Sequence, residues 1–304
     1  MNTEGLSNIE KSNIAHVKHN EKLLIKERDT RLFILRNKDN AEYLINKRTL
    51  DILEPFLKNK STWLTVGDYN GFEAKYLTEH NQEVVASDIA TDFLKASQEE
   101  GFIHTISQEN VEKLSFGDGR FNFTMCREAY HHFPRAYLGA YEMIRVANKA
   151  AIIIEPIDVL QKMPLLLWLK NMMDIINPLL INKIWKNRFS FETVGNYVFK
   201  ISEREVEKMA MGIGLPCIAF KRINVVMENI GEGVRDVPCN MKTLKTFKRK
   251  VAVKNILCKL HLIPYNTLCS VMFKQMPDQE LLNNLKSNGY EIIPLPVNPY
   301  LGKS

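Results

Sequence analysis

A chain of 304 residues is long enough to bury a full core, and this length favours one elaborated domain over two independent ones. Hydrophobic residues make up 45% and charged residues 25% of the sequence, which excludes the disordered and fibrous classes. The formal net charge of +6 raises nucleic acid as a partner, but the basic residues gather only at residues 242–254, with one aromatic, Phe247. This pattern is typical of a solvated helix face, so we do not expect nucleic acid to be the partner.

The cysteines and the hydropathy of the sequence indicate in which cellular compartment the protein resides. The five cysteines are odd in number and widely spaced, without a CxxC pair, which argues against a disulfide framework and a zinc site. The polar N-terminus lacks the apolar stretch of a secretion signal. Residues 163–185 are the most hydrophobic stretch, but Lys170, Asp174 and Pro178 interrupt them too often for a spanning helix. The sequence therefore predicts a cytoplasmic protein without a transmembrane segment.

Strands and helices alternate through the first half of the chain. The first twenty or so residues are polar, and we expect them to be poorly ordered. Apolar residues at helical spacing predict a helix over residues 40–57. Strands are then predicted at 63–66, 83–89, 103–107, 121–126 and 150–156, and helices at 72–80, 92–100 and 134–146. This alternation predicts a mainly parallel, twisted α/β sheet of the Rossmann-like kind, with helices on both faces.

The regular alternation of strands and helices ends after Pro156. Residues 159–187 read as one or two apolar helices, and they are followed by a helix at 203–211, a strand at 217–225, a basic helix at 241–262, a strand at 267–274, a helix at 278–285 and a strand at 291–296. We therefore divide the chain into an N-terminal tail and helical cap (1–58), a cofactor-binding core (59–158), a helical lid insertion (159–190), the completion of the sheet with a basic helical insert (191–275), and a C-terminal helix and strand (276–304).

The turn after the first predicted strand carries a ligand-site signature. Gly67 and Gly71 let the backbone bend sharply and approach a ligand closely. Asp88 ends the second strand twenty-one residues after Gly67, which is close to the spacing at which a carboxylate accepts hydrogen bonds from ribose hydroxyls. This pair alone fits either a nicotinamide-dependent dehydrogenase or a methyltransferase.

Further motifs carry a resemblance to a family. The turn GDYNG at 67–71, Asp88, the run ENVEKLSF at 109–116 and the block 121–133 with its two adjacent histidines resemble the successive motifs of class I S-adenosylmethionine-dependent methyltransferases of the small-molecule branch. The resemblance covers about residues 61–156 and favours the methyltransferase over the dehydrogenase. It implies that the glycine turn cradles the methionine part of S-adenosylmethionine, that Asp88 holds the ribose, and that Asn110 and Val111 lie against the adenine.

The expected cofactor-binding residues are Gly67, Asp68, Tyr69, Gly71, Asp88, Ile89, Asn110, Val111 and Arg127. Two positions depart from the family pattern, because Thr65 stands where an acidic residue is usual and Tyr69 where a third glycine is usual. The first departure weakens contacts to the methionine end, and the second crowds the turn or stacks near the ligand. These departures keep open a catalytically degenerate binding or scaffold protein that retains the fold.

Three residues are candidates for catalysis. Methyl transfer is an in-line displacement at a sulfonium, so the protein has to position the acceptor and remove its proton. His131 and His132 follow the fourth predicted strand, and histidine suits proton abstraction because its ordinary pKa is about 6.5. Glu155 ends the fifth strand and can reach an acceptor amine or hydroxyl, or act as a capping or ion-paired carboxylate. Glu128 with the two histidines is too small a cluster for us to expect a metal.

The sequence thus predicts an O- or N-methyltransferase that uses S-adenosylmethionine and acts on a small molecule, with a sugar-containing or other secondary metabolite ahead of lipid-like acceptors. The apolar residues of 159–185 suit a lid over such an acceptor, and equally a homodimer interface or core packing. An RNA methyltransferase that uses the basic segment 242–254 is a further alternative. The acceptor atom, the pathway and the oligomeric state are not encoded in any motif that we recognise.

Overall fold

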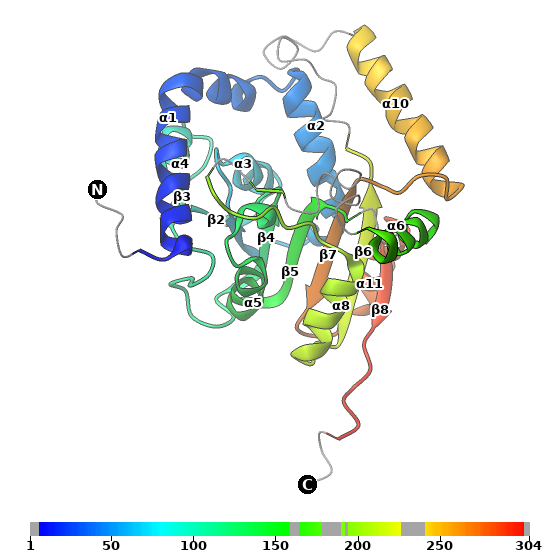
Figure 1. Cartoon of the computed structure of the whole chain (residues 1–304). Helices are drawn as coiled ribbons and strands as arrows, with labels where there is room; N and C mark the ends of the chain where they lie inside the picture. The colour runs from blue at the N-terminus through cyan, green and yellow to red at the C-terminus, as the bar shows by residue number, and fades with distance from the viewer. Residues whose placement is uncertain (1–5, 159–163, 178–189, 192–193, 226–240, 301–304) are drawn as a thin grey trace.

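The computed structural model describes residues 6–158, 164–177, 190–191, 194–225 and 241–300. Its strands form one eight-stranded sheet in the order β3-β2-β1-β4-β5-β7-β6-β8 (Figure 1). The strands are β1 (Thr62–Val66), β2 (Glu83–Asp88), β3 (Thr105–Gln108), β4 (Phe121–Arg127), β5 (Ala147–Pro156), β6 (Cys217–Ile223), β7 (Thr267–Phe273) and β8 (Glu291–Pro294). Strands β1 to β5 pair in parallel, whereas β7 is antiparallel to β5 and β6, and β8 is antiparallel to β6. The predicted mainly parallel α/β sheet is confirmed.

Helices cover both faces of this sheet. The helices α3 (Phe72–Glu79), α4 (Asp92–Glu99) and α11 (Gln279–Ser287) lie on one face, and α5 (Ala136–Val146) and α8 (Glu203–Gly212) lie on the other. Neighbouring residues of a strand point to opposite faces of the sheet. Trp63 therefore packs in the core beneath α3, α4 and α11, and Leu64 packs in the core beneath α5 and α8; both are fully buried. A strand that is covered on both sides has to be apolar throughout, which explains the continuous apolar runs in the sequence.

The N-terminal segment differs from its prediction. Residues Asn8–Arg36 form a helix, α1, so the expected poorly ordered tail is wrong for most of its length. Ser7 begins the helix with a capping box, in which its side chain accepts from the Glu10 N–H and the Glu10 carboxylate accepts from the Ser7 N–H. Ion pairs from Arg28 to Glu99 and from Arg36 to Glu100 join α1 to the end of α4. The helix therefore stands beside the β3 edge of the sheet (Figure 1).

The predicted helix at 40–57 is divided in two. Helix α2 (Ala41–Leu50) is followed by a tighter 3₁₀ turn, Asp51–Phe56, which contains Pro55. Proline lacks the N–H that a continuing α-helix needs, so the change of helix type follows from the sequence.

Two further helices lie on the side of the molecule opposite α1 (Figure 1). Helix α6 (Pro164–Ile176) falls within the predicted lid insertion, of which residues 159–163 and 178–189 lie outside the described part. Helix α10 (Met241–Lys259) is the predicted basic helix. Within the ranges that the structure describes, no helix combines the length and the apolarity needed to cross a membrane.

Candidate active site

A cavity of about 450 Å³ lies at the carboxyl ends of β1, β2 and β4, beneath α1 and α2. Eight of the predicted site residues line it: Gly67, Tyr69, Asp88, Ile89, Asn110, Val111, Arg127 and His132. We call their part of the lining the sheet wall. The other four, Asp68, Gly71, His131 and Glu155, do not line the cavity.

The turn after β1 places the sheet wall close to β4. Gly67 has a φ of 66°, and a Cβ built on it would lie 2.6 Å from the Cβ of Ala129. Both the backbone conformation and the space therefore require glycine. Gly71 also has a positive φ, 80°, and caps the N-terminus of α3, where a Cβ would meet the Ile103 side chain at 2.9 Å. Gly71 thus shapes the turn from behind instead of facing the cavity.

Asp68 is buried beneath the turn. Its carboxylate accepts from the backbone N–H groups of Glu73 (3.1 Å) and Ala74 (2.9 Å) and from the Thr65 hydroxyl (2.7 Å). Burial, together with the negative charge of Glu73, raises the pKa of Asp68 well above its usual range. Thr65 therefore donates a hydrogen bond where an acidic side chain would add a further negative charge beside Asp68. This geometry accounts for the first departure from the family pattern.

Arg127 ties β4 to the helices above the sheet. Its guanidinium donates to the Glu73 carboxylate and, at 3.1 Å, to the Asn46 amide oxygen. Burial would raise the pKa of Glu73, but the positive charge of Arg127 outweighs it, and the pKa lies below its ordinary value. The ion pair is almost wholly buried, so removal of either partner would leave an uncompensated charge.

Asp88 lies at the end of β2 with its carboxylate in the sheet wall. One oxygen accepts from the Ala90 N–H at 2.9 Å and the other from the Tyr69 N–H at 3.1 Å. An ionised carboxylate offers about four acceptor positions, so these two bonds fix its orientation and leave positions for ligand hydroxyls. Burial raises the pKa of Asp88 to about 6.

Tyr69 does not close the cavity. Its φ is 29°, which is a strained value for a residue with a side chain. The ring packs against Phe93, with centroids 4.6 Å apart, and the Arg31 guanidinium lies 5.5 Å from the ring centroid. Its hydroxyl oxygen is buried without a hydrogen-bond partner. The second departure from the family pattern therefore adds an aromatic surface and an unpaired polar atom to the wall.

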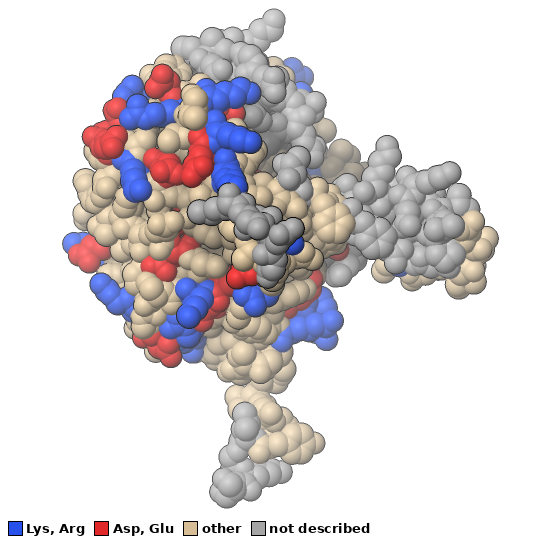
Figure 2. All heavy atoms as spheres, turned by 60° about the vertical axis from the view of Figure 1, so that its left-hand side comes forward, with Lys and Arg blue, Asp and Glu red and all other residues tan. Residues whose placement is uncertain are grey.

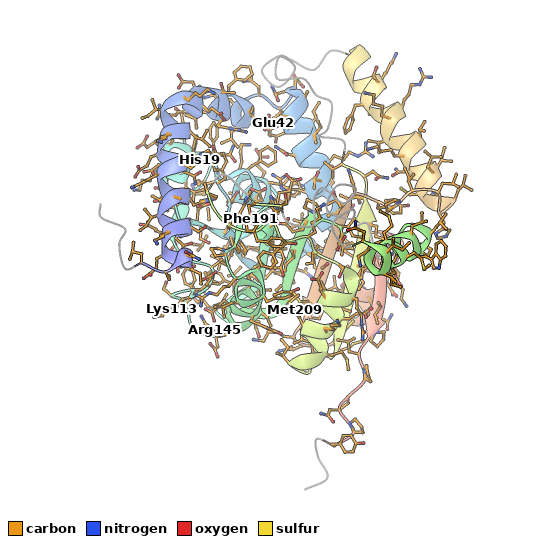
Figure 3. All side chains as sticks on the ribbon, viewed as in Figure 1. His19, Glu42, Lys113, Arg145, Phe191 and Met209 are labelled. Carbon is orange, nitrogen blue, oxygen red and sulfur yellow. The ribbon has the colours of Figure 1, made fainter. Side chains whose placement is uncertain are left out.

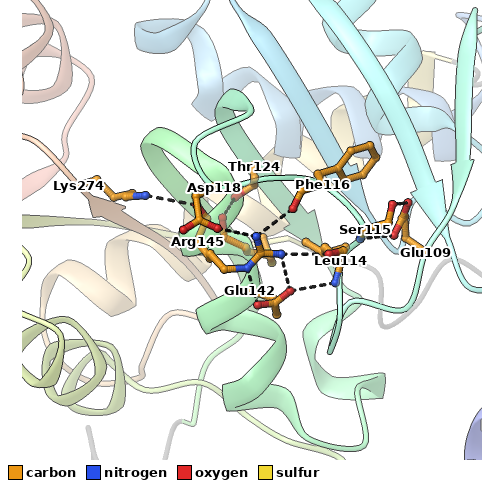
Figure 4. A network of polar contacts seen from close by, with 10 residues as sticks. Glu109, Leu114, Ser115, Phe116, Asp118, Thr124, Glu142, Arg145 and Lys274 are labelled. Carbon is orange, nitrogen blue, oxygen red and sulfur yellow. Dashed lines mark hydrogen bonds and ion pairs between the residues drawn. The ribbon is translucent and has the colours of Figure 1, made fainter.

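A polar network fixes the loop that carries Asn110 and Val111 (Figure 4). The Glu109 carboxylate accepts from the Ser107 and Ser115 hydroxyls at 2.8 and 2.6 Å. Arg145 of α5 donates to the carbonyl oxygens of Leu114 and Phe116 and pairs with Asp118 and Glu142 (Figure 4). These contacts hold both ends of the loop, so Asn110 and Val111 are presented to the cavity from a fixed backbone.

The three predicted catalytic residues form one cluster, but only His132 reaches the cavity. Glu155 is fully buried, and its carboxylate accepts from the N–H groups of Ala129 (2.6 Å) and Tyr130 (2.7 Å) and contacts His131 Nδ1 at 2.7 Å. Glu155 therefore organises the loop and cannot itself touch an acceptor. The His131 ring lies 4.0 Å from the His132 ring, and His132 lies 5.9 Å from His16 of α1.

The opposite side of the cavity comes from α1, which the sequence did not predict, and from α2, which falls within the helix predicted at 40–57. We call it the helical wall; it comprises Ser12, Asn13, His16, His19, Asn20, Leu23, Arg31, Glu42 and Asn46 (His19 and Glu42 are labelled in Figure 3). The α1 members recur at spacings of three and four residues and so share one helix face. Asn20 is 4% exposed, and its amide nitrogen has no hydrogen-bond partner. A buried unpaired donor in a cavity wall indicates a group that binds a ligand.

The predicted lid does not form this wall in the part of the chain that the structure describes. No described residue of α6 lines the cavity, whereas α1 covers it. Among the residues with described positions, no group of three or more His, Cys, Asp or Glu side chains is arranged to hold a metal ion.

Comparisons with known proteins match the central part of the chain to one domain family. Residues 64–154 match the family described as "Methyltransferase domain", a range that spans β1 to β5. No curated protein sequence matches the chain. Among solved structures, 1,6-didemethyltoxoflavin-N1-methyltransferase from Burkholderia thailandensis, with bound 1,6-didemethyltoxoflavin and S-adenosylhomocysteine, is 11% identical, covers 89% of this chain and 92% of its own, and has a TM-score of 0.51.

Two other solved structures align at lower TM-scores. A methyltransferase from Archaeoglobus fulgidus that depends on S-adenosylmethionine is 13% identical, with 75% of this chain and 92% of its own covered and a TM-score of 0.47. Magnesium protoporphyrin IX methyltransferase from Synechocystis, with bound S-adenosylhomocysteine, is 12% identical, with 77% and 84% covered and a TM-score of 0.45.

The residues of the sheet wall fit the cofactor of this family. Asp88 offers acceptor positions for two ribose hydroxyls, the backbone at Gly67 carries no Cβ, and Asn110 and Val111 lie together at the next strand end. Residues 64–154 thus form a methyltransferase domain, and the chain has the fold of the S-adenosylmethionine-dependent methyltransferases.

Proposed function

We propose that the protein methylates a hydroxyl or amine of a small molecule in the cavity between the sheet wall and the helical wall. The observation that carries this proposal is that one cavity joins Asp88, at the end of β2, to His132, beyond the end of β4. A cofactor whose ribose is held by Asp88 and an acceptor beside His132 would share this space. Bound S-adenosylmethionine supplies the electrophilic methyl group.

His132 is the proposed proton acceptor. A hydroxyl or neutral amine attacks the methyl carbon with its lone pair and has to lose a proton as the new bond forms or just after, and a histidine in the cavity wall can take that proton. His131 and Glu155 are positioning residues in this proposal. The Glu155 carboxylate holds His131, and the His131 ring packs against His132 and so limits its orientation.

The polar helical wall favours a polar acceptor. Asparagine and histidine side chains of α1 line the half of the cavity that faces the sheet wall, and such groups suit the hydroxyls of a sugar-containing or other secondary metabolite. The solved methyltransferase from Burkholderia thailandensis also binds a small molecule. We also propose a cytoplasmic location, which is supported by four cysteines that are buried and free of disulfides. We propose further that residues 59–158 form the cofactor-binding core and that the remaining segments flank it.

The test measures binding and turnover separately. Titration calorimetry with S-adenosylmethionine should show binding, and a panel of hydroxyl- and amine-bearing small molecules should yield S-adenosylhomocysteine. His132→Gln should keep cofactor affinity but lower kcat by roughly 10²- to 10⁴-fold. The matched control is His104→Gln, because His104 is exposed and lies outside the cavity.

Three results would contradict the proposal. Turnover of His132→Gln at the rate of His104→Gln would remove the proposed base. Cofactor binding without turnover of any acceptor would favour a degenerate binding protein. Methylation of RNA instead of the small molecules would assign the site to the RNA class.

A further inference from the structure

Large exposed apolar side chains concentrate on two helices outside the active site. On α6, Leu165 is 70% exposed, Trp168 57%, Ile175 80% and Ile176 75%. On and just after α10, Val253, Ile256, Leu260 and Leu262 are each more than half exposed. Exposed apolar side chains that gather on one helix mark an interaction site, because their contact with water is unfavourable.

The exposed residues of α6 share one face. Leu165, Trp168, Leu169, Met172, Ile175 and Ile176 follow each other at spacings of one and three residues. This spacing is that of an amphipathic helix whose apolar stripe normally packs on a core. Here the stripe faces outwards, and one of its members is a tryptophan, the residue that prefers the boundary between lipid and water.

Helix α10 combines apolar and basic side chains on its outer face. Val253, Ile256 and Leu260 lie three and four residues apart, so they form a stripe. The sequence 241–259 contains seven Lys and Arg residues and no Asp or Glu. Lys245, Lys248, Arg249, Lys250 and Lys259 are exposed on either side of this stripe. Lysine and arginine can lay their methylene stems along apolar surface while the charged ends reach polar groups.

Both helices emerge from the edge of the sheet that holds the active site. Helix α6 follows the end of β5 and α10 precedes the start of β7, and Pro156 and Thr267 at these two ends are paired with each other. The helices lie on the side opposite α1 (Figure 1), and the face over α1 carries a mixture of acidic and basic side chains (Figure 2). The face over α1 therefore lacks the uniformly basic character of α10.

We propose that the outer faces of α6 and α10 form a docking surface that binds the protein peripherally to an anionic lipid bilayer. An anionic bilayer is the partner that satisfies both properties, because its headgroups attract the lysines and its acyl boundary accepts the aliphatic and tryptophan side chains. Nucleic acid would leave the apolar stripes in water. A second copy of the chain would bring two uniformly basic helices together.

Vesicle flotation of the full chain tests this proposal. The wild type should float with vesicles that contain phosphatidylglycerol, bind pure phosphatidylcholine vesicles far more weakly, and lose binding as the salt concentration rises. The triple variant Lys245→Gln, Lys248→Gln, Lys250→Gln should partition on the order of 100-fold more weakly at low salt. The control, Lys18→Gln, Lys22→Gln, Lys26→Gln, removes the same charge from exposed positions of α1 and should bind like the wild type.

A second pair of variants tests the apolar contribution. Trp168→Ser with Ile175→Ser should weaken binding by roughly tenfold or more, while Ile25→Ser, at an 89% exposed position of α1, should have no effect. Tryptophan emission should shift to the blue when anionic vesicles are added, and the shift should shrink in Trp168→Phe. These readouts are independent of cofactor binding and turnover, so they can fail while the proposed function stands.

Several outcomes would overturn the docking surface. Equal flotation with neutral and anionic vesicles, or no flotation, would remove it, as would equal losses in the α10 and α1 triple variants. If Trp168→Ser with Ile175→Ser instead converts a dimer to a monomer in sedimentation and leaves vesicle binding unchanged, the stripe is an interface between copies. If the α10 triple variant loses salt-sensitive RNA binding and no vesicle binding, α10 serves nucleic acid.

Discussion

The two walls of the active-site cavity are built by different rules. The sheet wall consists of strand ends and the turns that follow them, so chain topology alone brings Gly67, Asp88 and Asn110 together. The helical wall consists of one face of α1, where residues such as His16 and Asn20 reach the cavity only because the helix packs across it. The positions of the sheet-wall residues therefore follow from short sequence motifs, whereas those of the helical-wall residues follow from the tertiary packing of α1.

We expect the largest effect from a substitution that removes the Asp88 carboxylate, the central hydrogen-bond acceptor of the sheet wall. Asp88→Ala should weaken S-adenosylmethionine binding by about 100-fold or more, because each hydrogen bond to a charged group contributes about 1.5–3 kcal/mol and two ribose hydroxyls lose their acceptor. Titration calorimetry measures the affinity. Glu83→Ala, at the exposed opposite end of the same strand, is the matched control and should bind normally.

Asp88 also supports the backbone at Tyr69 and Ala90, so a second variant separates binding from folding. Asp88→Asn keeps one acceptor oxygen and should lose about tenfold in affinity with a smaller change in thermal stability. Unchanged cofactor affinity in both variants, with folding intact, would mean that the ribose is held elsewhere.

The next effect concerns the turn that brings the sheet wall close to β4. Gly67→Ala should lower the free energy of unfolding by about 2–4 kcal/mol, since a side chain at positive φ costs about 1–2 kcal/mol and the new Cβ also collides with Ala129. Gly101→Ala has a similar φ, 74°, with open space around it, and should lose only about 1 kcal/mol. Chemical denaturation compares them, and equal losses would show that Ala129 yields easily.

Sequence patterns predicted the sheet wall because each residue type is needed where it stands. A strand, a glycine turn and an acidic residue at the next strand end specify their own positions, and Gly67, Asp88, Asn110 and Val111 all line the cavity. Asp68 is likewise an acidic residue that follows a strand, yet its side chain points away from the cavity and accepts hydrogen bonds from the first turn of α3. Sequence spacing does not distinguish these two directions, because both satisfy a carboxylate with backbone N–H groups.

The helical wall escaped prediction for a physical reason. Helix α1 has no apolar stripe through its first half, since its inner residues, among them Ser12, His16 and Asn20, face a polar cavity and not a core. Hydrophobic periodicity detects burial against a core alone. The capping box of Ser7 and Glu10 was the signal that could have revealed the start of this helix.

A pH titration of cofactor binding sharpens the role of the sheet wall. Burial raises the pKa of Asp88 to about 6, so the free protein takes up a proton there as the pH falls through 6. Ribose hydroxyls donate best to the ionised carboxylate, and binding should therefore weaken by about tenfold between pH 7 and pH 5. His16, His19 and His132 also line the cavity in every variant, so the comparison is with Asp88→Asn, whose affinity should change less. Parallel pH profiles for the two proteins would exclude Asp88 as the titrating group.

The smallest expected effect tests whether the helical wall touches ligand at all. Asn20 carries a buried amide nitrogen without a partner, and an unpaired donor destabilises the free protein. Asn20→Leu, which is similar in size and apolar, should leave the thermal stability unchanged or raised, but should weaken binding of cofactor or acceptor by about fivefold, the value of one neutral hydrogen bond. A purely structural asparagine would show the reverse, with lower stability and unchanged binding. No sequence motif assigns a role to the inner face of α1. A variant that keeps or gains thermal stability but binds ligand more weakly would therefore show that this face binds the ligand and does not serve packing alone.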